Sequence, residues 1–284
     1  SPFAQPGKKQ PKRGTKGIAA TEMESKGEFG ASVDEMRGQL LSLTRYQAGC
    51  RFLQRQLDGS DPVRATEIVG YVLEECGSQL QSVVMDNCGQ YLLPKLVEHA
   101  SVEQRSFLVH RLCPYIFRVA VDPCGSHGLQ RILPYLNDQQ AAELGRCMAP
   151  TLVDLAKDSK GNYLLQAFLK SFGPGPRIQF IVDILVENII ALSNHKVGCT
   201  VITRCLERSN PQQMSQFLNA IERHSFQLVV DQYGNYVVQH ILLNCGPEYT
   251  VRIIHSLHGK IGFLCQQKFG SNVVEKCLES SDPQ

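Results

Sequence analysis

Apolar residues along most of the chain recur at intervals of three and four, which is the spacing of an amphipathic helix rather than a strand. The segments NYLLQAFLKSF (162–172) and NYVVQHILLN (235–244) show this pattern without strict alternation. A further apolar segment, RIQFIVDILVENIIAL (177–192), follows the first of these, and we predict that it forms a single second helix, joined by a short link to the next such segment. The pattern therefore predicts a fold built from α-helices alone.

Helix-start signals fall between the apolar segments. Asp61-Pro62 is typical of an N-cap followed by proline in the first turn. Ser101 and Gln104 have the spacing of a capping box. The run GPGP (173–176) and the Asn210-Pro pair indicate loops after which a helix restarts.

A glycine followed by a similar group of five residues recurs along the chain, and we call these groups the pentads. The glycines are Gly49, Gly89, Gly125, Gly161, Gly198, Gly234 and Gly270, separated by 40, 36, 36, 37, 36 and 36 residues. The pentads read CRFLQ, QYLLP, SHGLQ, NYLLQ, CTVIT, NYVVQ and SNVVE. This period predicts a solenoid in which each repeat buries its apolar face on its neighbours. We expect an all-α, curved, right-handed solenoid with about three helices in each repeat of roughly 36 residues.

Composition changes this picture mainly at the ends of the chain. Residues 1–30 are rich in Pro, Lys, Gly and Ser, and they are expected to form a disordered basic arm. Residues 31–284 then form the repeat domain. Because Ser281-Asp282-Pro283 repeats Ser60-Asp61-Pro62, we expect the chain to be truncated inside its seventh repeat. The sequence contains no run of 18 apolar residues, so it predicts no membrane-spanning helix.

The cysteines and histidines predict no metal site and no catalytic site. The 11 cysteines have no zinc-ligand spacing, and we expect reduced thiols that serve as small core residues. Cys124 and His127 lie close in sequence but lack the further groups that a nucleophile needs. His195, just before a repeat glycine, is expected in a turn. No phosphate-binding loop or metalloprotease motif is present, so we expect neither enzyme activity nor a cofactor nor a small-molecule substrate.

The net charge of the chain is only +2, so the overall charge does not indicate a nucleic-acid-binding protein, and only the local positions of the charges are informative. Outside residues 1–37 the chain holds 22 basic and 22 acidic residues. The residue that follows the pentad is nevertheless cationic in five repeats: Arg55, Lys95, Arg131, Arg204 and Lys276. Stacked repeats would align these side chains into a basic stripe, which suits contact with phosphates.

The pentads themselves suit recognition of a nucleobase. On a helix, offsets 0 and 4 share a face, and offset 1 points about 100° away. Two polar side chains can thus meet a base edge while a flat side chain enters the stack between bases. Asn with Gln matches uracil, Ser with Glu matches the adjacent N–H donors of guanine, and Cys with Gln leaves room for adenine. Offsets 2 and 3 are apolar and should anchor the helix, except at Gly128.

The pentads and their period closely resemble those of the Pumilio/FBF (PUF) family of RNA-binding repeats. The motif NYxxQ occurs twice and SNVVEKC once, and the resemblance covers about residues 40–280. It implies a concave face that binds single-stranded RNA antiparallel to the chain. The implied base-edge residues are Cys50, Gln54, Gln90, Ser126, Gln130, Asn162, Gln166, Cys199, Thr203, Asn235, Gln239, Ser271 and Glu275. The implied stacking residues are Arg51, Tyr91, His127, Tyr163, Thr200, Tyr236 and Asn272.

The resemblance also implies a target sequence, 5′-G-U-N-U-A-N-A-3′, read from the seventh repeat to the first. The second repeat has Pro94 at offset 4 and is not expected to read a base, because proline offers no side-chain hydrogen bond and can distort the helix. The fifth repeat, with the short Thr203, should select loosely. The eighth repeat usual in the family would add the leading U of a UGU element.

The function expected from this resemblance is post-transcriptional regulation in the cytoplasm. The protein would bind UGU-containing elements in mRNA 3′ untranslated regions and cause repression or decay, with effector proteins on its convex face. One alternative is a nucleolar PUF-like factor in ribosome biogenesis. A second is a protein-interaction solenoid of the armadillo or HEAT kind, which would not require the amide and aromatic regularity of the pentads.

Overall fold

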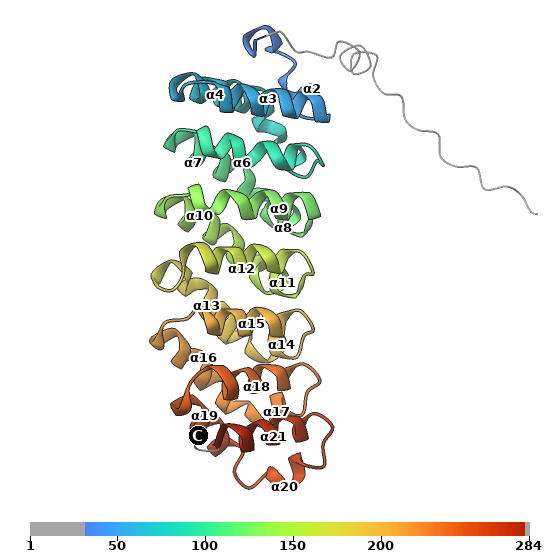
Figure 1. The fold of residues 1–284 in the computed structure, drawn as a ribbon, viewed down its shortest axis with the longest axis vertical. Helices are drawn as coiled ribbons and strands as arrows, with labels where there is room; N and C mark the ends of the chain where they lie inside the picture. Colours follow the sequence, from blue (N-terminus) through green and yellow to red (C-terminus); the bar gives the residue numbers. More distant parts are fainter. Residues whose placement is uncertain (1–31, 282–284) are drawn as a thin grey trace, which may run out of the picture.

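The computed structural model describes residues 32–281, whose helices stack in a column from the N-terminal to the C-terminal end (Figure 1). Each complete repeat has a short helix, a helix that carries the pentad and a third helix, as the sequence predicts. Residues 32–281 contain no strand, and none of their helices is both long and apolar enough to cross a bilayer. The predicted basic arm at 1–30 and the Asp282-Pro283 pair lie outside the described residues.

The helices fall into three sets and a few 3₁₀ turns. The short helices are α2 (Leu40–Leu43), α5 (Leu80–Val84), α8 (Ile116–Val121), α11 (Leu152–Lys157), α14 (Ile189–Ser193), α17 (Ser225–Val229) and α20 (Ile261–Leu264). The pentad helices are α3 (Gln47–Gly59), α6 (Gly89–His99), α9 (Pro123–Ile132), α12 (Gly161–Phe172), α15 (Gly198–Glu207), α18 (Gly234–Asn244) and α21 (Gly270–Ser281). The third helices are α4 (Pro62–Cys76), α7 (Val102–Leu112), α10 (Asp138–Met148), α13 (Gln179–Glu187), α16 (Pro211–Arg223) and α19 (Pro247–Ser256). The 3₁₀ turns are η1 (Asp34–Met36), η2 (Gly77–Gln79), η3 (Cys113–Tyr115), η4 (Leu133–Tyr135), η5 (Ala149–Thr151) and η6 (Pro176–Ile178).

The predicted helix starts are confirmed. The carboxylate of Asp61 accepts hydrogen bonds from the backbone N–H groups at the start of α4, at 3.0 and 3.1 Å. Ser101 and Gln104 form a complete capping box, and so do Asn210 and Gln213. These caps satisfy N–H groups that a helix leaves without an internal partner.

Glutamines in these caps also tie each repeat to the one before. The side-chain amide of Gln104 donates to the carbonyl of Thr66 at 2.9 Å, and that of Gln213 donates to the carbonyl of Gly175 at 3.0 Å. Gln140 does the same toward Val102 at 2.9 Å. The third helices are therefore joined by hydrogen bonds as well as by the apolar core.

The apolar segment 177–192 forms two helices, so the prediction of a single helix there is wrong. The chain leaves the helical conformation at Asn188, between α13 and α14, with φ −109° and ψ 23°. The side-chain amide of Asn188 donates to the carbonyl of Ile184 at 2.9 Å and so satisfies an acceptor near the end of α13. The apolar pattern continues across the break because Leu185 and Ile189 are both buried in the same core.

The recurring glycines allow each pentad helix to pack tightly on the short helix before it. At all seven positions the nearest groups include the residue that lies six positions earlier in the chain. A Cβ atom on Gly198 would lie 2.5 Å from the carbonyl oxygen of Leu192, and one on Gly234 would lie 2.8 Å from that of Leu228. Such distances are well inside van der Waals contact, so the turn between the two helices requires glycine.

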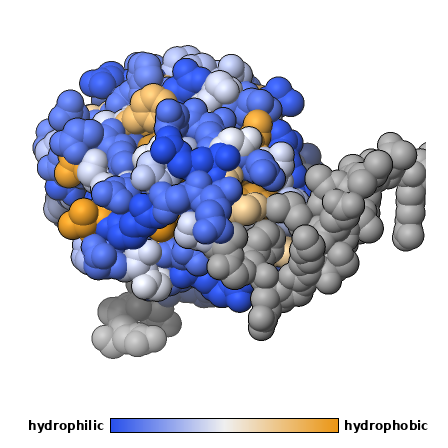
Figure 2. Space-filling model, turned by 90° about the horizontal axis from the view of Figure 1, so that it is seen from above, coloured by the Kyte–Doolittle hydropathy of each residue, from blue (hydrophilic) through white to orange (hydrophobic). Residues whose placement is uncertain are grey.

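The N-terminal end of the column is closed by polar contacts. The carboxylate of Glu75 accepts hydrogen bonds from the backbone N–H groups of Gly38 at 2.7 Å and Leu40 at 2.9 Å. The guanidinium of Arg37 lies over the ring of Tyr71, 4.2 Å from its centroid, and also pairs with Glu74. Seen along the column from this end, the surface is mostly hydrophilic with scattered hydrophobic residues (Figure 2). A polar outer face is what the terminal repeat of a solenoid needs.

The cysteines differ from the expectation in the exposed Cys265, which is not a core residue, and in one bonded pair. Cys113 and Cys147 form a disulfide with a Cα–Cα distance of 5.5 Å, so the prediction of reduced thiols is wrong for these two. The pair was not visible in the sequence because its members lie 34 residues apart, at equivalent ends of α7 and α10. Cys76 and Cys205 are buried free thiols, as expected. No group of three or more His, Cys, Asp or Glu side chains within residues 32–281 is gathered in a way that could hold a metal ion.

We predict that Gly198→Ala destabilises the protein, because the added methyl group must displace the backbone of Leu192. The free energy of unfolding should fall by roughly 1–3 kcal/mol, measured by urea denaturation. Gly59→Ala is the matched control, because its Cβ would meet nothing within 4 Å. It should be neutral or stabilising by up to about 1 kcal/mol. Equal effects of the two substitutions would contradict the close approach at Gly198.

Candidate nucleic-acid interface

The pentad helices form a continuous row, because each packs against the next along the column (Figure 1). Their offset-1 tyrosines all point into solvent: Tyr91 is 49%, Tyr163 50% and Tyr236 58% exposed. Their offset-2 and offset-3 residues are buried in the core, as predicted, and Leu164 and Leu165 of α12 are examples. One helix face thus anchors each pentad while the neighbouring face is presented to solvent.

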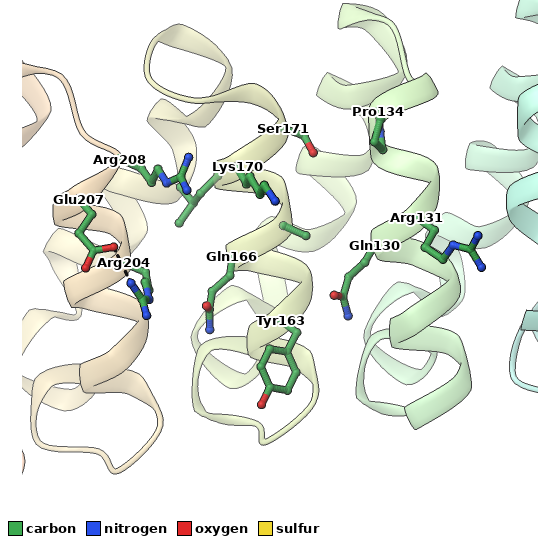
Figure 3. A pocket seen from close by; sticks show the side chains of 12 residues that line it. Gln130, Arg131, Pro134, Tyr163, Gln166, Lys170, Ser171, Arg204, Glu207 and Arg208 are labelled. Carbon is green, nitrogen blue, oxygen red and sulfur yellow. Dashed lines mark hydrogen bonds and ion pairs between the residues drawn. The ribbon is translucent and has the colours of Figure 1, made fainter.

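A groove with a volume of about 780 Å³ runs across three pentad helices. Tyr163 and Gln166 of α12 project into it beside Gln130 of α9 and Arg204 of α15 (Figure 3). Offset-1 and offset-4 side chains from successive repeats therefore share one open surface. Lys170 and Arg208 also line the groove, and the pentad pattern did not predict them as part of the interface.

A smaller cavity of about 360 Å³ lies between α3 and α6. Its walls include Arg51 of the first repeat and Tyr91 of the second, and Cys50 and Gln54 line it as well. The cavity thus brings together two groups able to stack on a base and the pair predicted to meet its edge. We call this cavity the first slot.

The offset-0 asparagines lie beneath this surface, which differs from the expectation that both amides of a pair are presented to a base. Asn162 is 5% and Asn235 1% exposed. The side-chain N–H of each donates to the backbone carbonyl four residues earlier, Asp158 or Asp231, at 2.8 Å. The carbonyl oxygen of each then accepts from the offset-4 glutamine at 2.7 Å. The buried amide therefore orients the half-buried glutamine that lines the surface.

The offset-0 residues of the first, third and fifth repeats, Cys50, Ser126 and Cys199, are buried as well. Ser126 is buried, its hydroxyl donates to the carbonyl of Lys160 at 3.2 Å, and it accepts from Gln130 at 3.1 Å. Burial raises the pKa of the Cys50 thiol to about 12, and it raises the pKa of Cys199 as well. Both thiols are therefore neutral near pH 7 and act by shape rather than by charge.

The fifth and seventh repeats differ at offset 4. The hydroxyl of Thr203 is turned back to the carbonyl of Thr200 in its own helix, at 3.0 Å. Thr200 itself is exposed. By contrast, the carboxylate of Glu275 is exposed and makes no hydrogen bond or ion pair with residues 32–281. Asn272 beside it is exposed too, whereas Ser271 donates to the carbonyl of Lys268 at 3.3 Å.

In the second repeat, helix α6 continues through Pro94, so the predicted distortion does not interrupt it. Pro94 is buried and presents no polar group. The side-chain amide of Gln90 is turned toward the neighbouring turns, where it donates to the carbonyl of Asn87 at 3.1 Å and to Sγ of Cys124 at 3.3 Å. Pro94 therefore offers no hydrogen-bonding group, and the half-buried Gln90 offers only its amide oxygen, because both of its N–H groups are used.

The basic stripe is largely neutralised by carboxylates, which the sequence analysis missed. Three of its five members are ion-paired to an acid three residues later in the same helix: Lys95 to Glu98 at 3.1 Å, Arg204 to Glu207 at 2.8 Å and Lys276 to Glu279 at 2.7 Å. The spacing of these pairs, i to i+3, was visible in the sequence. Arg55 and Arg131 make no ion pair with any residue between 32 and 281.

Lys95 is the most strongly held member of the stripe. It also pairs with Asp58 of the first repeat at 2.7 Å, and this hydrogen bond raises the pKa of Lys95 and lowers that of Asp58. The two pentad helices α3 and α6 are thereby linked by an ion pair. A phosphate approaching Lys95 must compete with Asp58 and Glu98.

Capping residues three positions before the repeat glycines were also missed by the sequence analysis. The carboxylate of Asp158 accepts from the N–H groups of Lys160 and Gly161, each at 2.7 Å. Asp86, Asp122 and Asp231 cap in the same way. In the fifth repeat Nδ1 of His195 replaces the carboxylate and accepts from Gly198 at 3.3 Å, so its prediction as a turn residue is confirmed.

The fold and this surface define a helical repeat protein whose successive pentad helices present stacking and polar side chains on one face. Seven segments match the Pumilio-family RNA-binding repeat: 39–70, 79–113, 115–144, 152–186, 188–222, 224–258 and 260–284. The chain belongs to this family, as the resemblance of its pentads predicted.

The relatives share the repeat domain and extend beyond it. A Pumilio domain-containing protein of Schizosaccharomyces pombe is 34% identical over 248 residues, which are 87% of this chain and 36% of the relative. Pumilio homolog 12 of Arabidopsis thaliana is 30% identical over 258 residues, which are 88% of this chain and 42% of the relative. The chain thus spans about two fifths of the length of these curated relatives.

Solved structures agree with this assignment. The Puf4 RNA-binding domain bound to a 3′ UTR recognition sequence of HO endonuclease RNA superimposes with a TM-score of 0.75 at 32% identity, over 84% of this chain and 74% of that one. The RNA-binding domain of yeast Puf5p bound to MFA2 RNA gives 0.75 at 29% identity, over 85% and 67%. Both are PUF solenoids, which confirms the predicted fold class.

We predict that Asn235→Asp destabilises the protein, because a buried carboxylate cannot donate to the carbonyl of Asp231. The free energy of unfolding should fall by about 1–3 kcal/mol. Gln232→Glu is the control: it makes the same amide-to-carboxylate change at an exposed position and should stay within about 0.5 kcal/mol of wild type. An Asn235→Asp variant as stable as the control would show that the buried amide does not hold the pentad.

Proposed function

We propose that this chain binds single-stranded RNA in a sequence-specific way, through elements of the form 5′-G-U-N-U-A-N-A-3′ in mRNA 3′ untranslated regions. The protein acts as a post-transcriptional regulator in the cytoplasm, and it represses or destabilises its target transcripts. Membership of the Pumilio family supports the first part of this proposal. The 3′ UTR sequence bound in the Puf4 structure supports the class of target.

The observation that carries the proposal is the alternation of stacking and edge groups along one open surface. The cavity between Arg51 and Tyr91 has two stacking walls, with Cys50 and Gln54 also in its lining. The groove over α9, α12 and α15 continues the same surface with Tyr163 and two glutamines. Stacking of bases on such side chains contributes about 1–3 kcal/mol for each base, and the edge groups add selectivity.

The guanine preference depends on Glu275. Its carboxylate is exposed, accepts hydrogen bonds only, and has no partner within residues 32–281. Guanine presents two adjacent N–H donors on its pairing edge, and a carboxylate can accept both. The other bases lack this pair of donors, so they would leave the carboxylate poorly matched.

We predict that RNA with guanine at the first position binds more tightly than RNA with any other base there. The difference should be about 1–3 kcal/mol by analogy with bidentate contacts to DNA bases, and Glu275→Gln should largely remove it. Fluorescence anisotropy with 5′-GUUUAUA-3′ and its first-position variants measures the effect.

The matched control for this measurement is Glu279→Gln, which removes a carboxylate from the same helix that pairs with Lys276. This variant should keep the guanine preference. Wild-type protein that is indifferent to the first base would contradict the assignment of Glu275.

We predict that Glu207→Gln raises the affinity for every RNA sequence, because it releases Arg204 from its ion pair. The gain should be about two- to fivefold, the worth of an exposed ion pair. The plot of log affinity against log salt concentration should steepen by about 0.7, the contribution of one further phosphate contact with a single strand.

Glu187→Gln serves as the charge control for this experiment. It also removes one negative charge, but from an exposed position on α13 that does not line the groove. Equal salt slopes for both variants and wild type would mean that Arg204 does not contact phosphate.

A further inference from the structure

The step between the second and third repeats differs from the others in its helix packing. Gly128 occupies offset 2 of the third pentad, where every other pentad has Phe, Leu or Val. A Cβ atom at Gly128 would already lie 3.4 Å from Cγ1 of Val84 and 3.5 Å from Cδ2 of Leu93. A Cβ atom there would thus already be in van der Waals contact with its neighbours, so α9 packs closely on α6.

This close packing brings the two offset-1 rings into contact. The ring centroids of Tyr91 and His127 are 5.7 Å apart, and their planes meet at 69° in an edge-to-face arrangement. That distance is typical of directly interacting rings. A base stacked between two rings needs about 7 Å between them, twice the optimal carbon–carbon separation. The space between Tyr91 and His127 therefore cannot hold a base in this arrangement.

The second repeat also offers few groups that could meet a base edge. Pro94 has no polar side-chain atom, and the N–H groups of Gln90 donate to Asn87 and Cys124, which leaves only its amide oxygen without a partner within residues 32–281. The preceding step is different, because a cavity of about 360 Å³ separates Arg51 from Tyr91. Tyr91 thus lines the first slot and also contacts His127.

We propose that Tyr91 and His127 close the second slot, so that the RNA nucleotide opposite the second repeat keeps its base outside the row. This inference rests on the proposed function. The sugar and phosphate of that nucleotide still bridge its neighbours, which are held by the first and third repeats. The protein then selects a spaced element in which the sixth nucleotide of 5′-G-U-N-U-A-N-A-3′ serves as a spacer.

The first test compares wild-type protein binding to 5′-GUUUAUA-3′ and to versions with an abasic site. An abasic sixth nucleotide should leave the affinity within about twofold, because its base makes no contact. An abasic fourth nucleotide, expected beside Tyr163, should cost about tenfold or more. Failure of the intact RNA to bind would overturn the proposed function itself. Binding of the intact RNA with equal losses at the two positions would overturn only the closed slot.

The second test uses 2-aminopurine, whose fluorescence is quenched when the base stacks. In complex with the wild-type protein, 2-aminopurine at the sixth position should stay bright, whereas at the seventh, between Arg51 and Tyr91, it should be quenched. His127→Ala removes an exposed ring and opens the slot, so the sixth position should become quenched against Tyr91. The seventh position should remain quenched in this variant and serves as the control. Quenching at the sixth position with wild-type protein, or unchanged brightness with His127→Ala, would contradict the proposal.

Discussion

The packing of each pentad helix against the last turn of the short helix before it sets the geometry of the whole surface. A glycine makes this contact in every repeat, because the residue six positions earlier leaves too little room for a Cβ atom. A capping side chain three residues before the glycine holds the same turn, as Asp158 and His195 do. With the start of the helix held in this way, offset 0 must point down into the turn. Offset 1 then faces outward in every repeat, and offset 4 does so in every repeat except the second, where Pro94 is buried.

The chemistry of the interface follows from this division between buried and outward positions. Asn162 and Asn235 lie beneath the surface and orient the glutamines there. The side-chain N–H of each donates to a backbone carbonyl, and its side-chain oxygen accepts from the offset-4 glutamine. Stacking groups and glutamines form the surface itself. Cations along its edge are mostly paired with carboxylates, which weakens the sequence-independent attraction to phosphates. In the proposed RNA complex, contacts with bases would consequently account for a larger share of the binding free energy than they would beside an unpaired basic stripe.

Much of this architecture could be predicted from the sequence, because it repeats. The 36-residue spacing, the helical pattern and the capping box at Ser101 each reflect local or periodic physics. Properties that depend on distances between elements could not be predicted in this way. A helical wheel gives the direction of Asn235 but not its depth, and the contact between Tyr91 and His127 depends on how closely α6 and α9 approach. The break at Asn188 was hidden because both flanking helices bury apolar residues in one core.

Selection of RNA ligands from a random pool by the purified protein tests the central claim most directly, because it examines every repeat in one measurement. The arrangement of side chains described above predicts a recovered consensus with guanine at its 5′ end, followed by uracils opposite the sixth and fourth repeats. Adenines are expected opposite the third and first repeats, with no preference opposite the second. A pool that yields no consensus, or one whose conserved bases do not follow the spacing of the repeats, would contradict the account.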